Sequence, residues 1–154
     1  MESFAGQFEQ IFKEAMFGLF VMSLVALTNI YSFTEISLGY QRTLQSRKLK
    51  SRHLEISRFM RYVMLLVFFQ FLSVGIWAVA LVMSGFVKDW MTAVILTASF
   101  FTSVGDFTVS LPIEWRLIPS LIAFTGLFSI AWATASTINM ARSLAEFLKE
   151  HKEI

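Results

Sequence analysis

The distribution of charge constrains this chain most, because three long stretches carry no charge. No Asp, Glu, Lys or Arg occurs in 15–34, 62–87 or 117–141, which are 20, 26 and 25 residues long. As helices rising ~1.5 Å per residue, these stretches reach ~30 Å or more, the thickness of a bilayer's hydrocarbon core. Charged residues make up 16% of the chain, against about 25% in soluble domains. The sequence therefore predicts an all-α membrane protein with three transmembrane helices in a lipid bilayer.

Basic residues gather between the first two uncharged stretches and indicate how the chain is oriented. Seven of them lie there: Arg42, Arg47, Lys48, Lys50, Arg52, Arg58 and Arg61. Short segments rich in Lys and Arg stay in the cytoplasm, so we expect the N-terminus outside and the C-terminus inside. Residues 41–61 form either a cytoplasmic helix that continues a span or a basic loop against anionic headgroups.

Both ends of the chain have an expected place in this topology. Residues 1–14 put Phe4, Phe8, Ile11 and Phe12 on one helical face, which predicts an interfacial helix on the outer surface. The first transmembrane helix then occupies 15–40. Residues 142–154 form a cytoplasmic tail that is too short for a nucleotide- or ligand-binding domain.

The segment between the second and third spans is not an ordinary polar loop. Residues 90–105 carry no charge, yet they are too few to span a bilayer and too apolar for water. Asp89 can cap a helix start, and 91–98 then read as one short helix. Apolar segments of this length are often re-entrant, and irregular backbone at membrane depth must be buried in protein or line a water-filled cavity. We therefore predict a helix that descends partway and a strand that returns, with several copies around an aqueous axis.

Residues 102–112 read Thr-Ser-Val-Gly-Asp-Phe-Thr-Val-Ser-Leu-Pro, with Trp115 and Arg116 shortly after. This string resembles the pore loop of the two-transmembrane potassium-channel family, whose small bacterial members have TTVGYGDVTLP followed by Trp-Arg. The two strings align without a gap. Trp77 and Gly126 fall where the family has an outer-helix motif and an inner-helix glycine hinge.

The resemblance covers roughly 63–141 and implies a potassium-channel-like pore built by a homotetramer in a bacterial plasma membrane. It divides a pore domain, 62–141, into an outer helix at 62–87, a pore helix and filter at 89–107, and an inner helix at 117–141. The first span and the basic segment lie outside it.

Family members bind dehydrated cations with filter carbonyls. Carried over to this chain, the ligands are the carbonyls of Thr102, Ser103, Val104 and Gly105, with the Thr102 hydroxyl facing the cavity. The negative C-terminal end of the pore helix, near residues 100 and 101, points toward the same cavity.

Two residues depart from the family's pattern. Asp106 replaces the Tyr that braces the filter, and Phe107 replaces its second Gly at the outer mouth, where a bulky residue at positive φ is strained. Four copies of Asp106 make an acidic ring that concentrates cations. The alternative for Asp106 is a surface residue that bonds backbone amides in a tight turn. We predict a shortened filter with poor selectivity for K⁺ over Na⁺.

Small and weakly polar residues recur along the last span and suggest a pore-lining stripe below the filter. The stripe consists of Thr125, Gly126, Ser129, Ala133, Ser136 and Met140. The alternative is a small-residue face for helix packing, which membrane helices use routinely.

The function expected from these features is passive conduction of monovalent cations, K⁺ and Na⁺, with Ca²⁺ as a divalent candidate. A non-conducting, channel-derived scaffold or partner subunit is the alternative, and Phe107 as a plug is its main support. We expect no enzyme, because no carboxylate pair, Ser/His arrangement or metal cluster lies at one membrane depth. We also expect no cofactor, no metal other than permeant cations, and no nucleic-acid partner.

Overall fold

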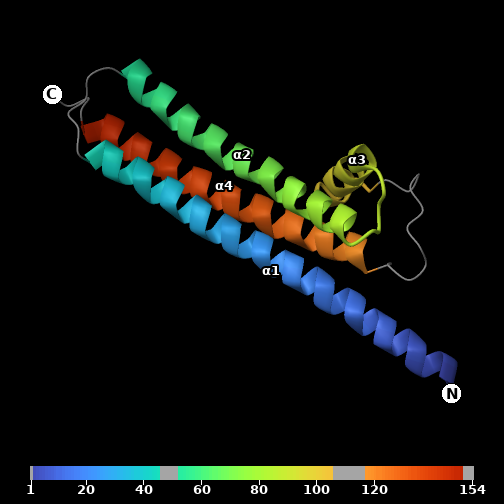
Figure 1. Cartoon of the computed structure of the whole chain (residues 1–154). Coiled ribbons are helices and arrows are strands. Elements are labelled where there is room, and N and C mark those ends of the chain that lie inside the picture. The colour runs from blue at the N-terminus through green and yellow to red at the C-terminus, as the bar shows by residue number, and fades with distance from the viewer. Residues whose placement is uncertain (1, 46–51, 106–116, 151–154) are drawn as a thin grey trace. The chain divides into compact units, whose positions relative to one another are not determined.

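The computed structural model describes residues 2–45, 52–105 and 117–150, and within these ranges every element of regular secondary structure is an α-helix. Figure 1 shows four helices: α1 (Glu2–Gln45), α2 (Arg52–Met83), α3 (Trp90–Phe101) and α4 (Ile118–Glu150). α1, from Ile11 onward, α2 and α4 are long and apolar enough to cross a membrane, whereas α3 is not. The prediction of an all-helical chain with three candidate membrane spans is confirmed.

The helices extend beyond the uncharged stretches that predicted them. α1 runs without interruption through the boundary expected between 14 and 15, because its sequence contains no Pro. Residues 41–45 end α1 and residues 52–61 begin α2, so these parts of the basic segment are helical, while 46–51 lie outside the described residues. α4 likewise continues past 141 to Glu150.

The chain divides into two compact units, which we describe separately. Unit 1 comprises Met1–Leu27 and Leu72–Ser129, and unit 2 comprises Thr28–Phe71 and Ile130–Ile154. Unit 1 contains all of α3.

In unit 1, apolar side chains from all four helices and the α2–α3 connection form one buried cluster. Its buried members are Val21, Val25, Trp77, Ala78, Leu81, Val87, Ala93, Leu96, Phe101, Ile118 and Ile122. The rings of Phe17 and Phe86 meet edge to face, with centroids 5.5 Å apart. Lipid tails are as apolar as these side chains, so close packing rather than removal from water stabilises such a cluster.

In unit 2, α1, α2 and α4 share a second cluster that is rich in aromatic rings. Its buried members are Phe33, Tyr40, Leu44, Leu66, Met140 and Leu144. The ring of Tyr40 meets those of Phe59 and Tyr62 edge to face, at centroid distances of 6.0 and 5.3 Å.

The long helices also expose many large apolar side chains. Phe20, Phe71 and Phe128 are each about two-thirds or more exposed. Apolar surface on this scale marks a region that contacts a membrane or another protein, which agrees with the three candidate spans.

Candidate functional site

The short helix α3 begins at the residue that the sequence predicts. Asp89 is its N-cap, and one carboxylate oxygen accepts hydrogen bonds from the backbone N–H and the hydroxyl of Thr92, both at 2.8 Å. These two bonds hold the pKa of the Asp89 carboxyl below its ordinary value, because they stabilise the charged form. The predicted cap is confirmed.

One face of α3 is buried in unit 1. Its buried residues are Ala93, Leu96, Thr97 and Phe101. Three of them, Ala93, Leu96 and Phe101, belong to the same cluster as residues of α2 and α4. Figure 1 shows α3 beside the ends of these two helices. A short apolar helix therefore lies against both of the spans that flank it in sequence.

The last residue of α3 contacts the backbone of α4. A Cβ atom built on Gly126 would lie 1.9 Å from the carbonyl oxygen of Phe101 and 2.7 Å from its carbonyl carbon. No side chain fits in that space, so only glycine allows this approach. Gly126 is thus the contact point on α4 for the end of α3, and the hinge role implied by the resemblance remains a prediction.

The residues after α3 turn back and cap its C-terminus. The backbone N–H groups of Val104 and Gly105 donate to the carbonyl of Ser99, at 2.9 and 3.0 Å, and the N–H of Ser103 donates to Phe100 at 2.9 Å. Ser103 and Gly105 have φ values of 60° and 72°, as expected where a helix ends in the left-handed region. Residues 102–105 therefore form a turn, and the returning strand predicted from the sequence does not begin within them.

This turn places main-chain carbonyls at an exposed edge of the described part of unit 1. Within the described part of the chain, no N–H donates to the carbonyl oxygens of residues 102–105. Thr102, Ser103 and Val104 are exposed, and Val104 is 76% exposed. The Thr102 hydroxyl donates to Ala98 at 2.9 Å, so its proton is engaged and its oxygen can still accept or ligate. The amides of the four predicted filter residues are all directed to α3, and their carbonyls accept no bond from an N–H of the described residues.

The two residues that distinguish this loop from the potassium-selective pattern cannot be placed. Asp106 and Phe107 lie outside the described residues. The acidic ring and the plug at the outer mouth both remain predictions from sequence.

The structure places most of the predicted stripe of α4 inside the chain. In unit 1, Thr125 and Ser129 are buried, as is Gly126. In unit 2, Ser136 and Met140 are buried and Ala133 is half-buried. The hydroxyl of Thr125 donates to the carbonyl of Leu121 in its own helix, at 2.6 Å. This burial favours the packing interpretation, which the sequence left open beside the pore-lining one.

One buried polar contact in unit 1 was not predicted from the sequence. The side chain of Glu14, on α1, is 2% exposed, and its Oε1 accepts from the backbone N–H of Leu117 at 2.6 Å and of Ile118 at 3.1 Å. These N–H groups stand at the start of α4, where helices lack internal partners. The Leu-Ile-Pro sequence there has no capping side chain, which is the local signal that an outside acceptor is needed.

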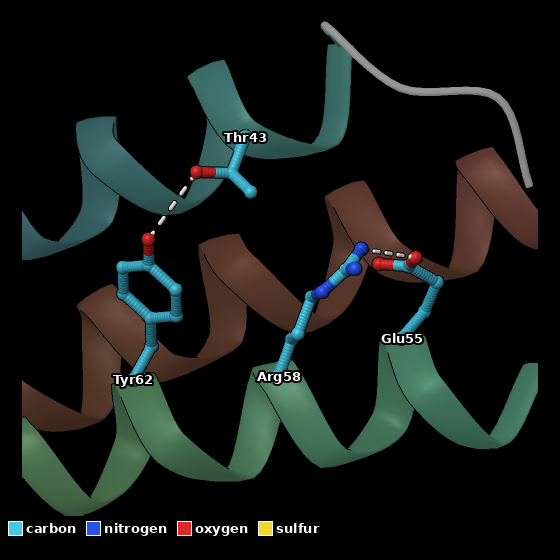
Figure 2. Close-up of polar contacts among 4 residues, drawn as sticks. All are labelled: Thr43, Glu55, Arg58 and Tyr62. Atoms are coloured by element: carbon cyan, nitrogen blue, oxygen red, sulfur yellow. Dashed lines mark hydrogen bonds and ion pairs between the residues drawn. The ribbon is translucent and has the colours of Figure 1, made fainter. Parts of the chain in front are cut away.

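Unit 2 contains two polar contacts near the C-terminal end of α1 and the N-terminal end of α2 (Figure 2). The guanidinium of Arg58 donates to the buried carboxylate of Glu55 at 2.5 Å. The hydroxyls of Tyr62 and Thr43 lie 3.3 Å apart. The Thr43 hydroxyl donates to the carbonyl of Gly39, so Tyr62 is the donor to Thr43. The contact of Tyr62 with Thr43 joins α2 to α1, whereas Glu55 and Arg58 pair within α2. Both contacts lie outside the unit that contains α3.

Unit 2 also has an open hollow of about 290 Å³ between α2 and α4. Aliphatic side chains line most of it, and the hydroxyls of Thr134 and Thr137 donate to carbonyls of their own helix. Among the residues that the structure describes, no three His, Asp or Glu side chains stand close enough to hold a metal ion. Comparison with protein-family models, curated proteins and solved structures found no match to this chain.

Proposed function

We propose that this chain is one subunit of a cation channel, a homotetramer in which the turn after α3 contributes ligands to a shared axis. The observation that carries the proposal is the turn itself: residues 102–105 direct their amides to α3 and leave four carbonyls without a donor from the described residues. Rings of such carbonyls replace the hydration shell of a permeating cation.

The position of α3 supports the same proposal. It is an apolar helix of 12 residues, too short to span a bilayer, and it is packed against α2 and α4 within one unit. An outer helix, a short helix with an exposed turn, and an inner helix are the parts that a re-entrant pore requires. In the proposed assembly, the exposed residues 102–104 face the other copies around the axis.

Selectivity in the proposed channel is set by few sites. Four carbonyls, followed in sequence by Asp106 and Phe107, make a filter shorter than the potassium-selective one. The acidic ring of Asp106 attracts monovalent and divalent cations. We therefore propose passive conduction of K⁺ and Na⁺ with little preference, and of Ca²⁺ where the acidic ring binds it.

Flux into vesicles that contain the purified protein tests conduction. Asp106→Asn is expected to lower cation uptake, and Ca²⁺ uptake most, because it removes the acidic ring. Asp89→Asn is the matched control: it removes the same charge from the same outer segment, and Asn caps helices about as well as Asp. Equal uptake by the wild type and both variants would contradict the proposed role of Asp106.

A second candidate function is a membrane scaffold or partner subunit that does not conduct. The burial of Thr125, Ser129, Ser136 and Met140 favours it, because a pore-lining side chain must reach the axis. The scaffold function predicts a stable oligomer that gives no cation flux in vesicles. If the Phe107→Gly variant also gives no flux, the result favours the scaffold over the channel.

Cysteine labelling distinguishes the two faces of α4, since the chain has no Cys of its own. Thr134 is exposed and Ser136, two residues on, is buried. If the exposed face of α4 lines an aqueous pore, Thr134→Cys reacts with a water-soluble thiol reagent and Ser136→Cys does not. Labelling of Ser136→Cys but not of Thr134→Cys would instead support the stripe predicted from the sequence as the pore lining.

A further inference from the structure

We infer that Glu14 is a positioning residue for the turn at 102–105, and that α1 is thereby an integral part of the site rather than an accessory span. The inference deepens the proposed function and rests on it for the meaning of that turn. The inference implies a structural coupling from α1 through α4 to the end of α3. This coupling can be measured without any assay of conduction.

The first link is the start of α4. Its first residues, Leu117, Ile118 and Pro119, include no Ser, Thr, Asp or Asn, so the helix does not cap itself. Leu117 and Ile118 stand before the first intrahelical bond, so their N–H groups have no partner within the helix, and Pro119 has no N–H at all. The Glu14 carboxylate accepts both of them, and a negative charge is favourable at this end of a helix.

The second link is the close approach of α1 that this contact requires. Gly18 lies one turn after Glu14, on the same face of α1. A Cβ at Gly18 would lie 2.3 Å from a methyl carbon of Leu121 and 3.2 Å from one of Ile118. Val21 and Val25 continue the buried face along α1. The face of α1 that carries Glu14 is thus the face that packs on the start of α4.

The third link connects α4 to the turn. Gly126 follows Ile118 by eight residues, a rise of about 12 Å, and it holds the carbonyl group of Phe101 in contact with the α4 backbone. Thr102 is the next residue and caps α3. A displacement of the start of α4 therefore moves the surface on which the end of α3 rests, and with it the turn.

Burial distinguishes Glu14 from the other acidic residue of this part of α1. Glu9 lies five residues earlier, is about two-thirds exposed and pairs with Lys13 at 2.6 Å. Lys13 is similarly exposed. Glu9→Ala therefore removes the same type of side chain from the same helix without touching α4, and it is the matched control.

Backbone hydrogen exchange of the full-length protein in lipid nanodiscs tests the inference. Glu14→Ala is expected to speed exchange at Leu117 and Ile118 about tenfold, the usual size of a lost cap. It is also expected to speed exchange severalfold at Val104 and Gly105, whose N–H groups bond to α3. Glu14→Gln keeps an acceptor oxygen and is expected to stay within about threefold of the wild type. Glu9→Ala should match the wild type at all four amides.

The pattern of exchange rates distinguishes a local cap at the start of α4 from a coupling that reaches the turn. Faster exchange at 117 and 118 with no change at 104 and 105 would overturn the inference, because Glu14 would then be only a local cap. No change at any of these amides, or equal changes in Glu9→Ala, would also overturn it. If both sites respond but the wild type conducts no cations, the positioning role stands and the proposed channel fails. If the wild type conducts, Glu14→Ala should alter the K⁺ to Na⁺ uptake ratio and Glu14→Gln should largely restore it.

Discussion

The contacts inside unit 1 differ in kind from the contacts inside unit 2. In unit 1, beside the buried side-chain cluster, two contacts of α3 and α4 involve the main chain: the carbonyl of Phe101 lies against Gly126, and the N–H groups of Leu117 and Ile118 donate to Glu14. In unit 2 the contacts are between side chains, namely the aromatic rings around Tyr40, the pair of Glu55 with Arg58, and the hydroxyls of Tyr62 and Thr43.

This difference has a consequence for how each unit tolerates change. A main-chain contact leaves no rotamer to adjust, so an added atom must move a helix. Contacts between side chains adjust more easily, provided that no charge is left buried and unpaired. We therefore expect unit 1 to respond most strongly to added volume and unit 2 to lost charge. The following predictions test that contrast.

Gly126→Ala is expected to have the largest effect. The new methyl group would lie 1.9 Å from the Phe101 oxygen, so α3 or α4 must shift, and we expect a loss of about 3 kcal/mol. Thermal unfolding in detergent measures it. Gly75→Ala is the control, because nothing lies within 4 Å of its added Cβ and Ala favours a helix interior by about 0.5–1 kcal/mol. Equal stability of the two variants would show that the close approach at Gly126 does not constrain the fold.

Gly126 also marks the limit of what the sequence predicts. Uncharged stretches locate the three long helices because they report membrane thickness, and Asp89 locates the start of α3 because a cap is local. Helix ends such as 41–45 and 142–150 are polar and extend beyond the membrane signal. That Gly126 contacts Phe101, 25 residues earlier, is not encoded in any local pattern.

Polar contacts between residues far apart in the chain could not be predicted from the sequence either. Glu14 and Ile118 are 104 positions apart, and the sequence around 117–119 reveals only that a cap is missing. The stripe on α4 was ambiguous for another reason, since both a packed face and a pore lining favour small residues.

Arg58→Met tests the charge sensitivity expected of unit 2. The side chain of Glu55 is 3% exposed and that of Arg58 18%, so removing the guanidinium leaves a carboxylate with little access to water. We expect a loss of about 2 kcal/mol in thermal unfolding. The double variant Glu55→Gln with Arg58→Met should recover most of it, because no charge then remains buried. If the double variant is less stable than the single one, the pair matters for its contacts rather than for its charge balance.

Asp89→Ala is expected to have a smaller and local effect in unit 1. It removes the cap of α3 and should speed exchange of the Thr92 amide about fivefold. The pKa of Asp89 is lowered in the folded chain, so its contribution is complete above the ordinary pKa of about 4 and is lost as pH falls through the lower, folded value. Asp89→Asn should keep the cap and remove this acid sensitivity. An acid response that persists in Asp89→Asn would assign it to another group.

Tyr62→Phe is expected to have the smallest effect, because it removes only a hydroxyl. Its contact with Thr43 is long, at 3.3 Å, while the ring meets Tyr40 edge to face and lies 3.8 Å from a Cβ built on Gly39. A hydrogen bond contributes a net stabilisation of about 0.5–1.5 kcal/mol. Because this one is long, we expect a loss of about 0.5 kcal/mol. Tyr62→Ala, which also removes the ring, should cost about 3 kcal/mol or more in thermal unfolding. The ratio of the two losses measures how far ring packing, rather than polar bonding, joins α1 to α2 in unit 2. A loss in Tyr62→Phe as large as that in Tyr62→Ala would reverse this assignment and make the hydroxyl, rather than the ring, the main link between α1 and α2 in unit 2.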